Sequence, residues 1–185
     1  MKNKAIIAIC GLSGTGKTTI ADIIAKEFFN SQRVVTITTR PKRPNEINGI
    51  DYNFISREQY ILYNSQGRII LQEDFNVANG EVWSYGLDIN SLNKEEIPII
   101  VLTPSGINEL NNLGYNVISF YIFVDEEERL NRIKLRNDNQ SKKEIERRSI
   151  EDKLKFVDFV PTFTITNMDL NSAVNQIKDI LRKEI

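Results

Sequence analysis

The sequence predicts an α/β protein, a three-layer sandwich in which helices cover both faces of a mainly parallel sheet. Three continuous apolar runs, at residues 5–10, 98–102 and 117–124, have the composition of strands that are buried on both faces. Helical patterns follow the first and third runs, and strands that alternate with helices are typical of a parallel sheet. The chain has 185 residues, of which 41% are hydrophobic, so we expect a single domain with a sizeable core.

The first part of the chain predicts a strand, a loop, a helix and a second strand. Glycines in residues 11–16 interrupt the first apolar run, and a helix is expected over 17–29 because apolar residues recur three and four positions apart. A β-branched strand is expected over 34–39, and Pro41 and Pro44 end it. The apolar face of the helix consists of Ile20, Ile23, Ile24 and Phe28.

Two polar insertions, at residues 36–94 and 126–152, separate the core segments 1–35, 95–125 and 153–185. The first insertion is rich in turn-forming residues, which indicates short elements joined by tight turns. Its candidate strands lie at residues 52–55, 68–71 and 82–85.

The last part of the chain returns to the core pattern. A charged helix is expected over 125–155, with a break near 137–141, and this helix contains the second insertion. A short strand is expected over 162–165, and an amphipathic helix over 170–181 completes the sandwich.

The composition excludes several classes of function. The formal net charge is −1, from 24 Lys and Arg against 25 Asp and Glu, so no global attraction to nucleic acid or to an anionic membrane is expected. The absence of histidine excludes Ser-His-Asp hydrolysis and histidine-ligated zinc. Cys10 is the single cysteine, and no apolar run reaches the roughly eighteen residues that span a bilayer. We therefore expect a cytoplasmic protein without a disulfide, a nucleic-acid partner or a membrane partner.

The loop after the first strand matches the phosphate-binding pattern G-x-x-x-x-G-K-[ST]. Its glycines let backbone N–H groups converge on an anion, and the following helix presents its positive N-terminus to that anion. Lys17 is expected to reach the β- and γ-phosphates as a catalytic residue, and the Thr18 hydroxyl to coordinate Mg²⁺. The nucleotide-binding residues expected here are Gly11, Leu12, Ser13, Gly14, Thr15, Gly16, Lys17, Thr18 and Thr19.

A second candidate phosphate site lies at residues 36–44, where three cations and three hydroxyls occur close together. Arginine binds phosphate oxygens through two N–H groups at once, and the prolines keep this segment out of a helix. A solvated basic loop is the alternative, and the segment alone does not distinguish the two. The residues are Thr36, Thr38, Thr39, Arg40, Lys42 and Arg43.

This segment and its continuation resemble the guanylate kinase signature T-T-R-x-x-R-x-x-E-x-x-G-x-D-Y-x-F. The matching residues are Thr38, Thr39, Arg40, Arg43, Glu46, Gly49, Asp51, Tyr52 and Phe54. The likeness resumes at Gly80, Tyr85, Gly86, the arginine-rich segment 129–148 and residues 164–167. It implies a P-loop NTPase core, a mixed-β insertion over 36–94 that binds the nucleoside monophosphate, and a helical lid over 126–152.

The resemblance also assigns roles to individual residues. The family glutamate that reads guanine falls near Asp74 if residues 81–86 carry a two-residue insertion, and on Glu73 otherwise. The resemblance places Asn167 near the adenine of ATP, and it makes Arg136 and Arg148 catalytic lid arginines. The remaining acceptor-binding residues that it implies are Thr36 for the base and Arg40, Arg43, Tyr52 and Tyr85 for the phosphate.

Three positions depart from the family pattern. Leu87 stands where a hydroxyl residue follows the Tyr-Gly pair, and Val101 and Thr103 stand where the family has paired aspartates. Those aspartates help to order the substrate and the metal–water shell in the family. The phosphate half of the acceptor site is therefore retained, while the base-reading half has changed.

The leading hypothesis is the ATP-dependent phosphorylation of a nucleoside monophosphate, GMP or dGMP, with Mg²⁺, by a monomer or a homodimer. A related P-loop kinase that acts on another nucleotide or on a ribose bisphosphate is the alternative, because the base-reading positions have changed. A non-catalytic guanylate-kinase-like scaffold is a third hypothesis. Such scaffolds typically lose the phosphate-loop lysine, whereas Lys17 is present here.

Overall fold

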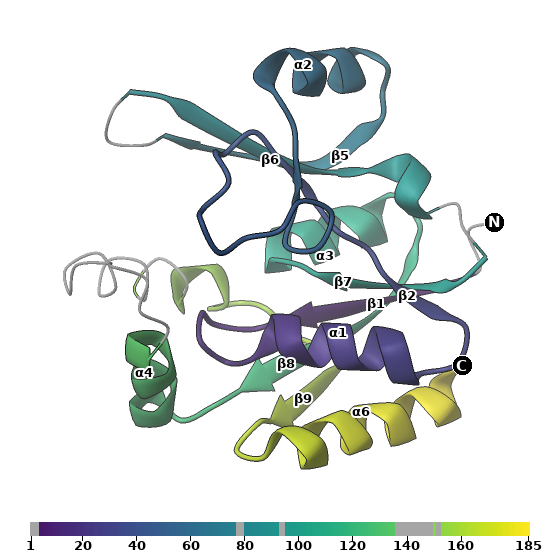
Figure 1. The fold of residues 1–185 in the computed structure, drawn as a ribbon. Helices are drawn as coiled ribbons and strands as arrows, with labels where there is room; N and C mark the ends of the chain where they lie inside the picture. Colours follow the sequence, from purple (N-terminus) through teal and green to yellow (C-terminus); the bar gives the residue numbers. More distant parts are fainter. Residues whose placement is uncertain (1–3, 77–79, 93–94, 136–149, 151–152) are drawn as a thin grey trace. The chain divides into compact units, whose positions relative to one another are not determined.

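The computed structural model describes residues 4–76, 80–92, 95–135, 150 and 153–185, and it divides into two compact units (Figure 1). The insertion unit is Val34–Glu96, and the core unit consists of Lys2–Arg33 and Ile97–Ile185. Among the described residues, none of the helices combines the length and the hydrophobicity that a membrane span requires.

The core unit is built on a five-stranded sheet with the strand order β2-β7-β1-β8-β9. Every neighbouring pair is parallel, and β1 pairs with β8 from Ala5 opposite Asn116 to Cys10 opposite Tyr121. All six residues of β1 are buried, as expected for a central strand with both faces covered. The strands are β1 (Ala5–Cys10), β2 (Ser31–Arg33), β7 (Ile97–Val101), β8 (Asn116–Phe123) and β9 (Phe163–Thr166).

Helices α1 (Lys17–Glu27) and α6 (Leu170–Glu184) cover one face of this sheet, and α3 (Pro104–Asn112) packs against β8 from the other side (Figure 1). Helix α4 (Glu126–Leu135) follows β8 along the chain. The arrangement confirms the predicted α/β sandwich with a parallel sheet. Buried apolar residues form one core between the strands and helices α1 and α6. They include Ile7, Ile9, Ile20, Ile24, Phe120, Val174, Ile177 and Leu181.

The insertion unit has its own mixed sheet with the strand order β4-β3-β6-β5. Strands β3 and β4 are parallel, whereas β6 runs antiparallel to both β3 and β5. Helix α2 covers one face, where its Tyr60 packs with Ile37 and Ile69 in a small apolar core. The elements are β3 (Ile37–Thr38), β4 (Asn53–Phe54), α2 (Arg57–Ser65), β5 (Ile69–Asn76), β6 (Val82–Asp88) and a 3₁₀ turn at Ile89–Leu92.

The predicted strand at 34–39 was wrong in its extent. The structure has β2 at Ser31–Arg33 in the core sheet and β3 at Ile37–Thr38 in the insertion sheet. The sequence pattern missed β2 because its three residues are polar and half-buried, which an edge strand tolerates since backbone pairing with β7 does not depend on apolar side chains.

Helices α2 and α3 were also missed, although each begins with a recognisable cap. Ser56 and Gln59 form a reciprocal capping box at the start of α2. Thr103 caps α3, and Pro104 occupies its first position. The apolar periodicity of α2 was too weak to predict a helix, because Tyr60 is the only buried residue of this helix.

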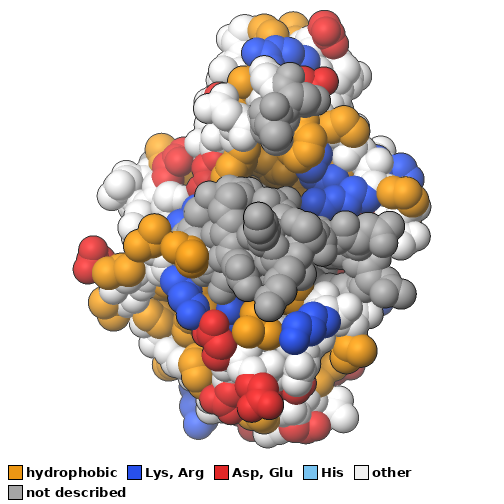
Figure 2. Space-filling model, turned by 90° about the vertical axis from the view of Figure 1, so that its left-hand side faces the viewer, with side chains coloured by type: hydrophobic (Ala, Val, Ile, Leu, Met, Phe, Trp, Pro, Cys, Tyr) orange, Lys and Arg blue, Asp and Glu red, His pale blue; other side chains and the backbone are white. Residues whose placement is uncertain are grey.

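Side chains of both charges occur on the surface. Figure 2 shows Lys and Arg in separate groups on the displayed face, with acidic and hydrophobic side chains between them. This mixture agrees with a formal net charge close to zero.

Candidate functional site

The loop between β1 and α1 has a backbone that glycine alone adopts readily. Gly11, Gly14 and Gly16 have φ angles of 142°, 87° and 89°. Gly16 also precedes the first turn of α1, and no side chain caps this end of the helix. The N–H groups of the first turn therefore lack a side-chain acceptor, which leaves the helix terminus ready to bind an anion.

The loop glycines also leave no room for a side chain. A Cβ at Gly11 would lie 2.5 Å from the carbonyl oxygen of Ile122, and one at Gly16 would lie 2.6 Å from Nδ2 of Asn167. Both distances are far below van der Waals contact, so the close packing of the loop on its neighbours requires glycine at these positions.

Two side chains of the loop converge on one of its carbonyl groups. Lys17 donates from Nζ to the Leu12 oxygen over 2.7 Å, and Thr15 donates from Oγ1 to the same oxygen over 2.9 Å. Lys17 is therefore held across the loop in which the phosphates are expected, and it can exchange the Leu12 carbonyl for a phosphate oxygen.

Asn167 contacts the loop rather than standing apart from it. Its side chain is 2% exposed, and its Nδ2 donates to the Thr15 carbonyl oxygen over 2.8 Å. The Oδ1 atom has no hydrogen-bond partner within the described part of the chain. The resemblance implies that Asn167 lies near the adenine, and the structure shows that its side chain supports the loop from the end of β9.

Thr18 suits a magnesium ion that arrives with the nucleotide. The described residues contain no group of three or more Asp, Glu, His or Cys side chains that could hold a metal. In kinases Mg²⁺ takes most of its ligands from phosphate and water, with only one or two from the protein. Thr18 is exposed in the first turn of α1, directly after Lys17, so its hydroxyl fits such a site.

In the insertion unit, Glu46 organises the two predicted phosphate-binding arginines. Its Oε1 accepts from Nη2 of Arg40 over 2.6 Å, and its Oε2 accepts from the backbone N–H of Arg43 over 2.8 Å. Arg40 is 5% exposed, and its Nη1 also donates to the Pro41 carbonyl over 2.9 Å. Burial by itself would lower the pKa of Arg40, but Glu46 and Tyr85 outweigh it and raise this pKa, so the cation is firmly retained.

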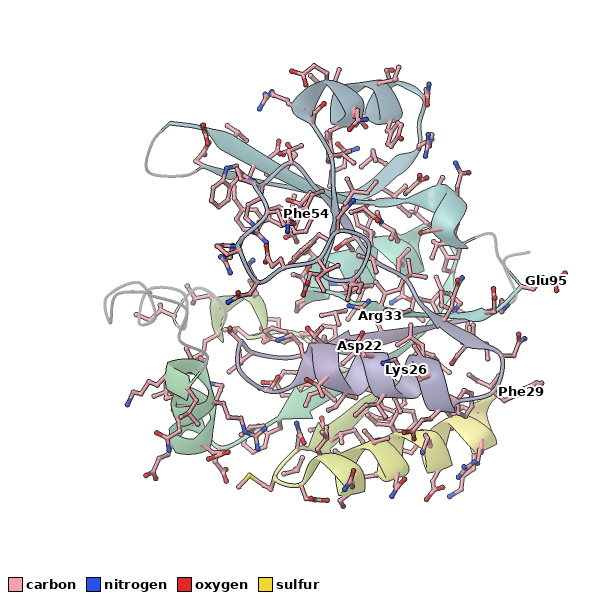
Figure 3. All side chains as sticks on the ribbon, viewed as in Figure 1. Asp22, Lys26, Phe29, Arg33, Phe54 and Glu95 are labelled. Carbon is pink, nitrogen blue, oxygen red and sulfur yellow. The ribbon has the colours of Figure 1, made fainter. Side chains whose placement is uncertain are left out.

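Aromatic rings form a continuous row beside Arg40. Tyr52 contacts two other rings edge to face. The distance between ring centroids is 5.7 Å to Phe54, which is labelled in Figure 3, and 5.8 Å to Tyr85. The Arg40 guanidinium lies 5.5 Å from the ring centres of both Tyr52 and Phe54. Burial raises the pKa of Tyr52, with Tyr85 adding to the effect, so this phenol stays a hydrogen-bond donor. Two tyrosine hydroxyls and a fixed guanidinium thus gather in one place.

A β-bulge decides which carboxylate of β5 shares a face with Tyr85. The pairing of β5 with β6 shifts between Ile70 and Glu73, and Leu71 in the bulge has a φ of 54°. Beyond the bulge, Glu73 lies opposite Tyr85. Without the extra residue, regular alternation from Ile70 would have brought Asp74 to this face.

A ring contact and an electrostatic effect agree with this assignment of faces. Phe75 packs edge to face against Tyr85 at 5.3 Å, and Glu73, two positions earlier in the strand, shares that face. The charge of Asp74 instead raises the pKa of Tyr60, which belongs to the face that α2 covers, although burial of the phenol is the larger cause. Glu73 therefore lies on the Tyr85 face and Asp74 on the opposite face, and the assignment of either one to the base stays a prediction.

The remaining predicted residues are distributed over both units. Thr36 is half-buried just before β3, and its carbonyl accepts from the Asn53 N–H over 2.9 Å. Leu87 is fully buried, and Val101 packs against the core cluster of its own unit. Thr103 is engaged as the cap of α3, where its hydroxyl accepts from the Gly106 N–H over 3.3 Å. The lid residues Arg136 and Arg148 lie outside the described residues.

The roles of Glu46 and Phe75 were not predicted from the sequence. Glu46 was matched to the signature without a role, and the preceding signature arginines were the signal that a carboxylate is needed to orient them. Phe75 was not considered, since its position on the Tyr85 face follows only from the bulge.

Comparison with known proteins identifies one family. The family model for guanylate kinase matches residues 2–184. A guanylate kinase of Malacoplasma penetrans is 31% identical over 195 aligned residues, which cover 100% of this chain and 96% of that protein. A guanylate kinase of Mesoplasma florum is 29% identical over 195 residues, and this chain spans 63% of its length.

A solved structure has the same fold. The crystal structure of guanylate kinase from Anaplasma phagocytophilum superposes with a TM-score of 0.69 at 22% sequence identity. The match covers 100% of this chain and 87% of the other. At this identity the similarity is evidence for the fold.

Proposed function

The chain belongs to the guanylate kinase family, and from this premise we propose that it transfers the γ-phosphate of ATP to GMP or dGMP. The observation that carries the proposal is the presence of two different groups of residues, each of which is suited to bind phosphate. The loop at residues 11–18 suits the phosphates of ATP, with Lys17 at its end. The cluster of arginines and tyrosines in the insertion unit suits the single phosphate of an acceptor nucleotide.

The proposed chemistry requires positioning and charge stabilisation. The acceptor phosphate is already anionic near neutral pH, so no general base has to remove a proton, and a chain without histidine can perform the transfer. Lys17 and the amides of the loop stabilise the negative charge on the ATP phosphates. We assign further stabilisation of the transferred phosphoryl group to Arg136 and Arg148. When bound, Mg²⁺ with Thr18 as a ligand supplies neutralising charge.

Arg40, Arg43, Tyr52 and Tyr85 are proposed to hold the acceptor phosphate. Glu46 fixes the guanidinium of Arg40 before the substrate arrives, so less side-chain entropy is lost on binding. The Arg43 side chain is exposed and can approach the phosphate from solvent. The tyrosine hydroxyls donate to the remaining phosphate oxygens.

Glu73 is proposed to read the base, and Thr36 to assist it. Guanine presents an N1–H and an amino group side by side, and one carboxylate can accept from both. Leu87 and Val101 replace polar family residues with apolar ones. A purely apolar site discriminates by only about 10–200-fold, whereas a hydrogen-bonding site reaches about 10⁴–10⁵. We therefore expect GMP or dGMP to be the best acceptor, with weaker rejection of AMP than the family pattern implies.

The test is a coupled ADP-release assay over a panel of nucleoside monophosphates, with Glu73→Gln and Asp74→Asn as matched variants. Each change removes one negative charge from neighbouring positions on opposite faces of β5. We expect Glu73→Gln to lower kcat/KM for GMP about 100-fold, while Asp74→Asn leaves it within about threefold. Equal losses in the two variants would contradict the assignment of Glu73.

The same assay tests the competing functions. Activity on a phosphorylated sugar without activity on any nucleoside monophosphate would favour the related P-loop kinase. Nucleotide binding without any turnover would favour the scaffold. We further propose a cytoplasmic enzyme that acts as a monomer or a homodimer, in accord with its nucleotide substrates and its single buried cysteine.

A further inference from the structure

Arg129 is the most deeply buried cation of the described chain, and neither the sequence prediction nor the proposed function gives it a role of its own. Its side chain is 1% exposed, although it lies in the polar helix α4. Burying a charge is expensive, and an apolar residue of similar volume is often neutral or better for stability. An arginine at this position therefore calls for an explanation other than packing.

The contacts of Arg129 lead to the phosphate loop. Its Nη1 donates to the carbonyl oxygen of Ser13 over 3.1 Å, and its Nη2 lies 3.5 Å from Oε1 of Glu126. Glu126 in turn pairs with Lys153 at 2.8 Å. The guanidinium is thus held from the helix side by a carboxylate and directed at one peptide group of the loop.

A separate observation places helix α4 directly against the same part of the loop. A Cβ on Gly14 would lie 2.9 Å from the carbonyl oxygen of Arg129 and 2.8 Å from Cγ1 of Ile133. The loop therefore rests on the backbone of α4 at the residue that follows Ser13.

The geometry of the peptide bond gives this contact a consequence for ligand binding. In a trans peptide the carbonyl of one residue and the N–H of the next point in opposite directions. All peptide bonds of the described chain are trans. When Arg129 holds the Ser13 carbonyl, the Gly14 N–H is turned away from α4.

We propose that Arg129 is a positioning residue of the phosphate loop, which fixes the Ser13–Gly14 peptide so that the Gly14 N–H faces the phosphates of ATP. This proposal rests on the proposed function only in taking the loop as the ATP site. Arg129 acts through the backbone and does not touch the nucleotide.

Arg129→Met tests the proposal, because methionine fills similar space without a donor. The affinity for ATP, measured by titration calorimetry on the full chain, is expected to fall about tenfold, the scale of one hydrogen bond. The KM for GMP is expected to stay within about twofold, since the acceptor residues belong to the other unit. Arg129→Lys retains a donor and a charge but loses the planar guanidinium, so its loss of ATP affinity is expected to be smaller but measurable, about threefold.

Arg33→Met is the matched control. Arg33 also lies in the core unit, pairs with Asp22 of helix α1 (Figure 3) and donates to the Ile99 carbonyl over 3.4 Å. Neither of these two interactions involves the phosphate loop, so the ATP affinity of Arg33→Met is expected to equal that of the wild type. An equal loss in Arg33→Met and Arg129→Met, or no loss in either, would overturn the positioning role.

Two further outcomes separate the possible failures. If Arg129→Met does not fold, Arg129→Lys is compared with Arg33→Lys, and equal ATP affinities in this pair overturn the proposal. If the wild-type chain binds no ATP, the function proposed for the loop fails, and the role of Arg129 toward ATP fails with it. Wild-type binding that Arg129→Met retains in full overturns only the role of Arg129.

Discussion

Lys17 already has a hydrogen-bond acceptor, the Leu12 carbonyl, at the place where phosphate oxygens are expected. Glu46 similarly accepts from Arg40 and from the Arg43 amide before any substrate is present. At the scale of single residues, Lys17 in the core unit and Arg40 in the insertion unit are therefore each held in place by contacts within their own unit. This preorganisation lowers the entropy lost on binding, because few rotamers remain to be selected.

Lys17→Ala should abolish most of the activity while preserving the fold. Charge-stabilising contacts in phosphoryl transfer contribute about 10³–10⁵ in rate, and we expect kcat/KM for ATP to fall about 10³-fold. Steady-state kinetics with thermal unfolding as a check on folding measures both effects. Turnover close to that of the wild type would contradict the kinase assignment.

Glu46 should make stability depend on pH. Burial would raise the pKa of Glu46, but the hydrogen bonds from Arg40 and the Arg43 amide, with their charges, lower it overall. The folded protein then binds this proton less tightly than the unfolded chain, so the contribution is present above about pH 4.3 and is lost as the pH falls through the folded pKa. We expect the difference in unfolding free energy between wild type and Glu46→Gln to shrink on acidification from about pH 7 to about pH 3. Denaturant titrations at several pH values measure it, and a constant difference would contradict the coupling.

At the scale of elements, short segments with strong end signals position the site. Helix α2 is only nine residues long, yet it supports the sheet face behind Tyr85, since the Tyr60 hydroxyl donates to the Tyr85 carbonyl over 3.0 Å. An isolated helix of this length is not stable, so its cap and its packing have to hold it.

Ser56→Ala should therefore destabilise the insertion unit through α2. The Ser56 hydroxyl accepts from the Gln59 N–H over 3.2 Å, and loss of such a cap costs about 1 kcal/mol. Denaturant unfolding measures the change. Ser65→Ala, at the other end of the same helix, is the matched control and should cost less than about 0.5 kcal/mol. Equal losses of unfolding free energy in Ser56→Ala and Ser65→Ala would contradict a specific contribution of the Ser56 cap.

At the scale of the whole molecule, the residues of the two proposed phosphate sites belong to separate compact units. The core unit carries the loop on a parallel sheet, and the insertion unit carries the acceptor residues on a mixed sheet with its own apolar cluster. We therefore expect ATP to slow amide hydrogen exchange in the core unit and GMP to slow it in the insertion unit.

Hydrogen exchange can test whether ATP and GMP bind to separate units. ATP alone should slow amide exchange in residues 11–18, and GMP alone should slow it in residues 36–54 and 73–87. A ligand at about 100 times its Kd stabilises the state that binds it by about 2.7 kcal/mol, which is large enough to detect. Lys17→Ala should remove the ATP effect and retain the GMP effect. Protection of residues 11–18 by GMP alone would contradict separate sites.

The sequence by itself determined the features that depend on neighbouring residues. The loop from Gly11 to Thr18 was predicted because its glycines, its lysine and its position between a buried strand and a helix are local properties of the sequence. The parallel core was predicted for the same reason, since continuous apolar runs are read directly from the chain.

Tertiary structure alone decided the features that depend on strand register and on contacts between distant segments. The bulge at Leu71 gives the Tyr85 face to Glu73 instead of Asp74, and one extra residue is enough because side chains alternate with a period of two. The contact of Arg129 with Ser13 joins residues 116 positions apart, so no local pattern could indicate it. Local sequence specifies which chemistry a segment can perform, whereas pairing and packing decide which side chains meet to perform it.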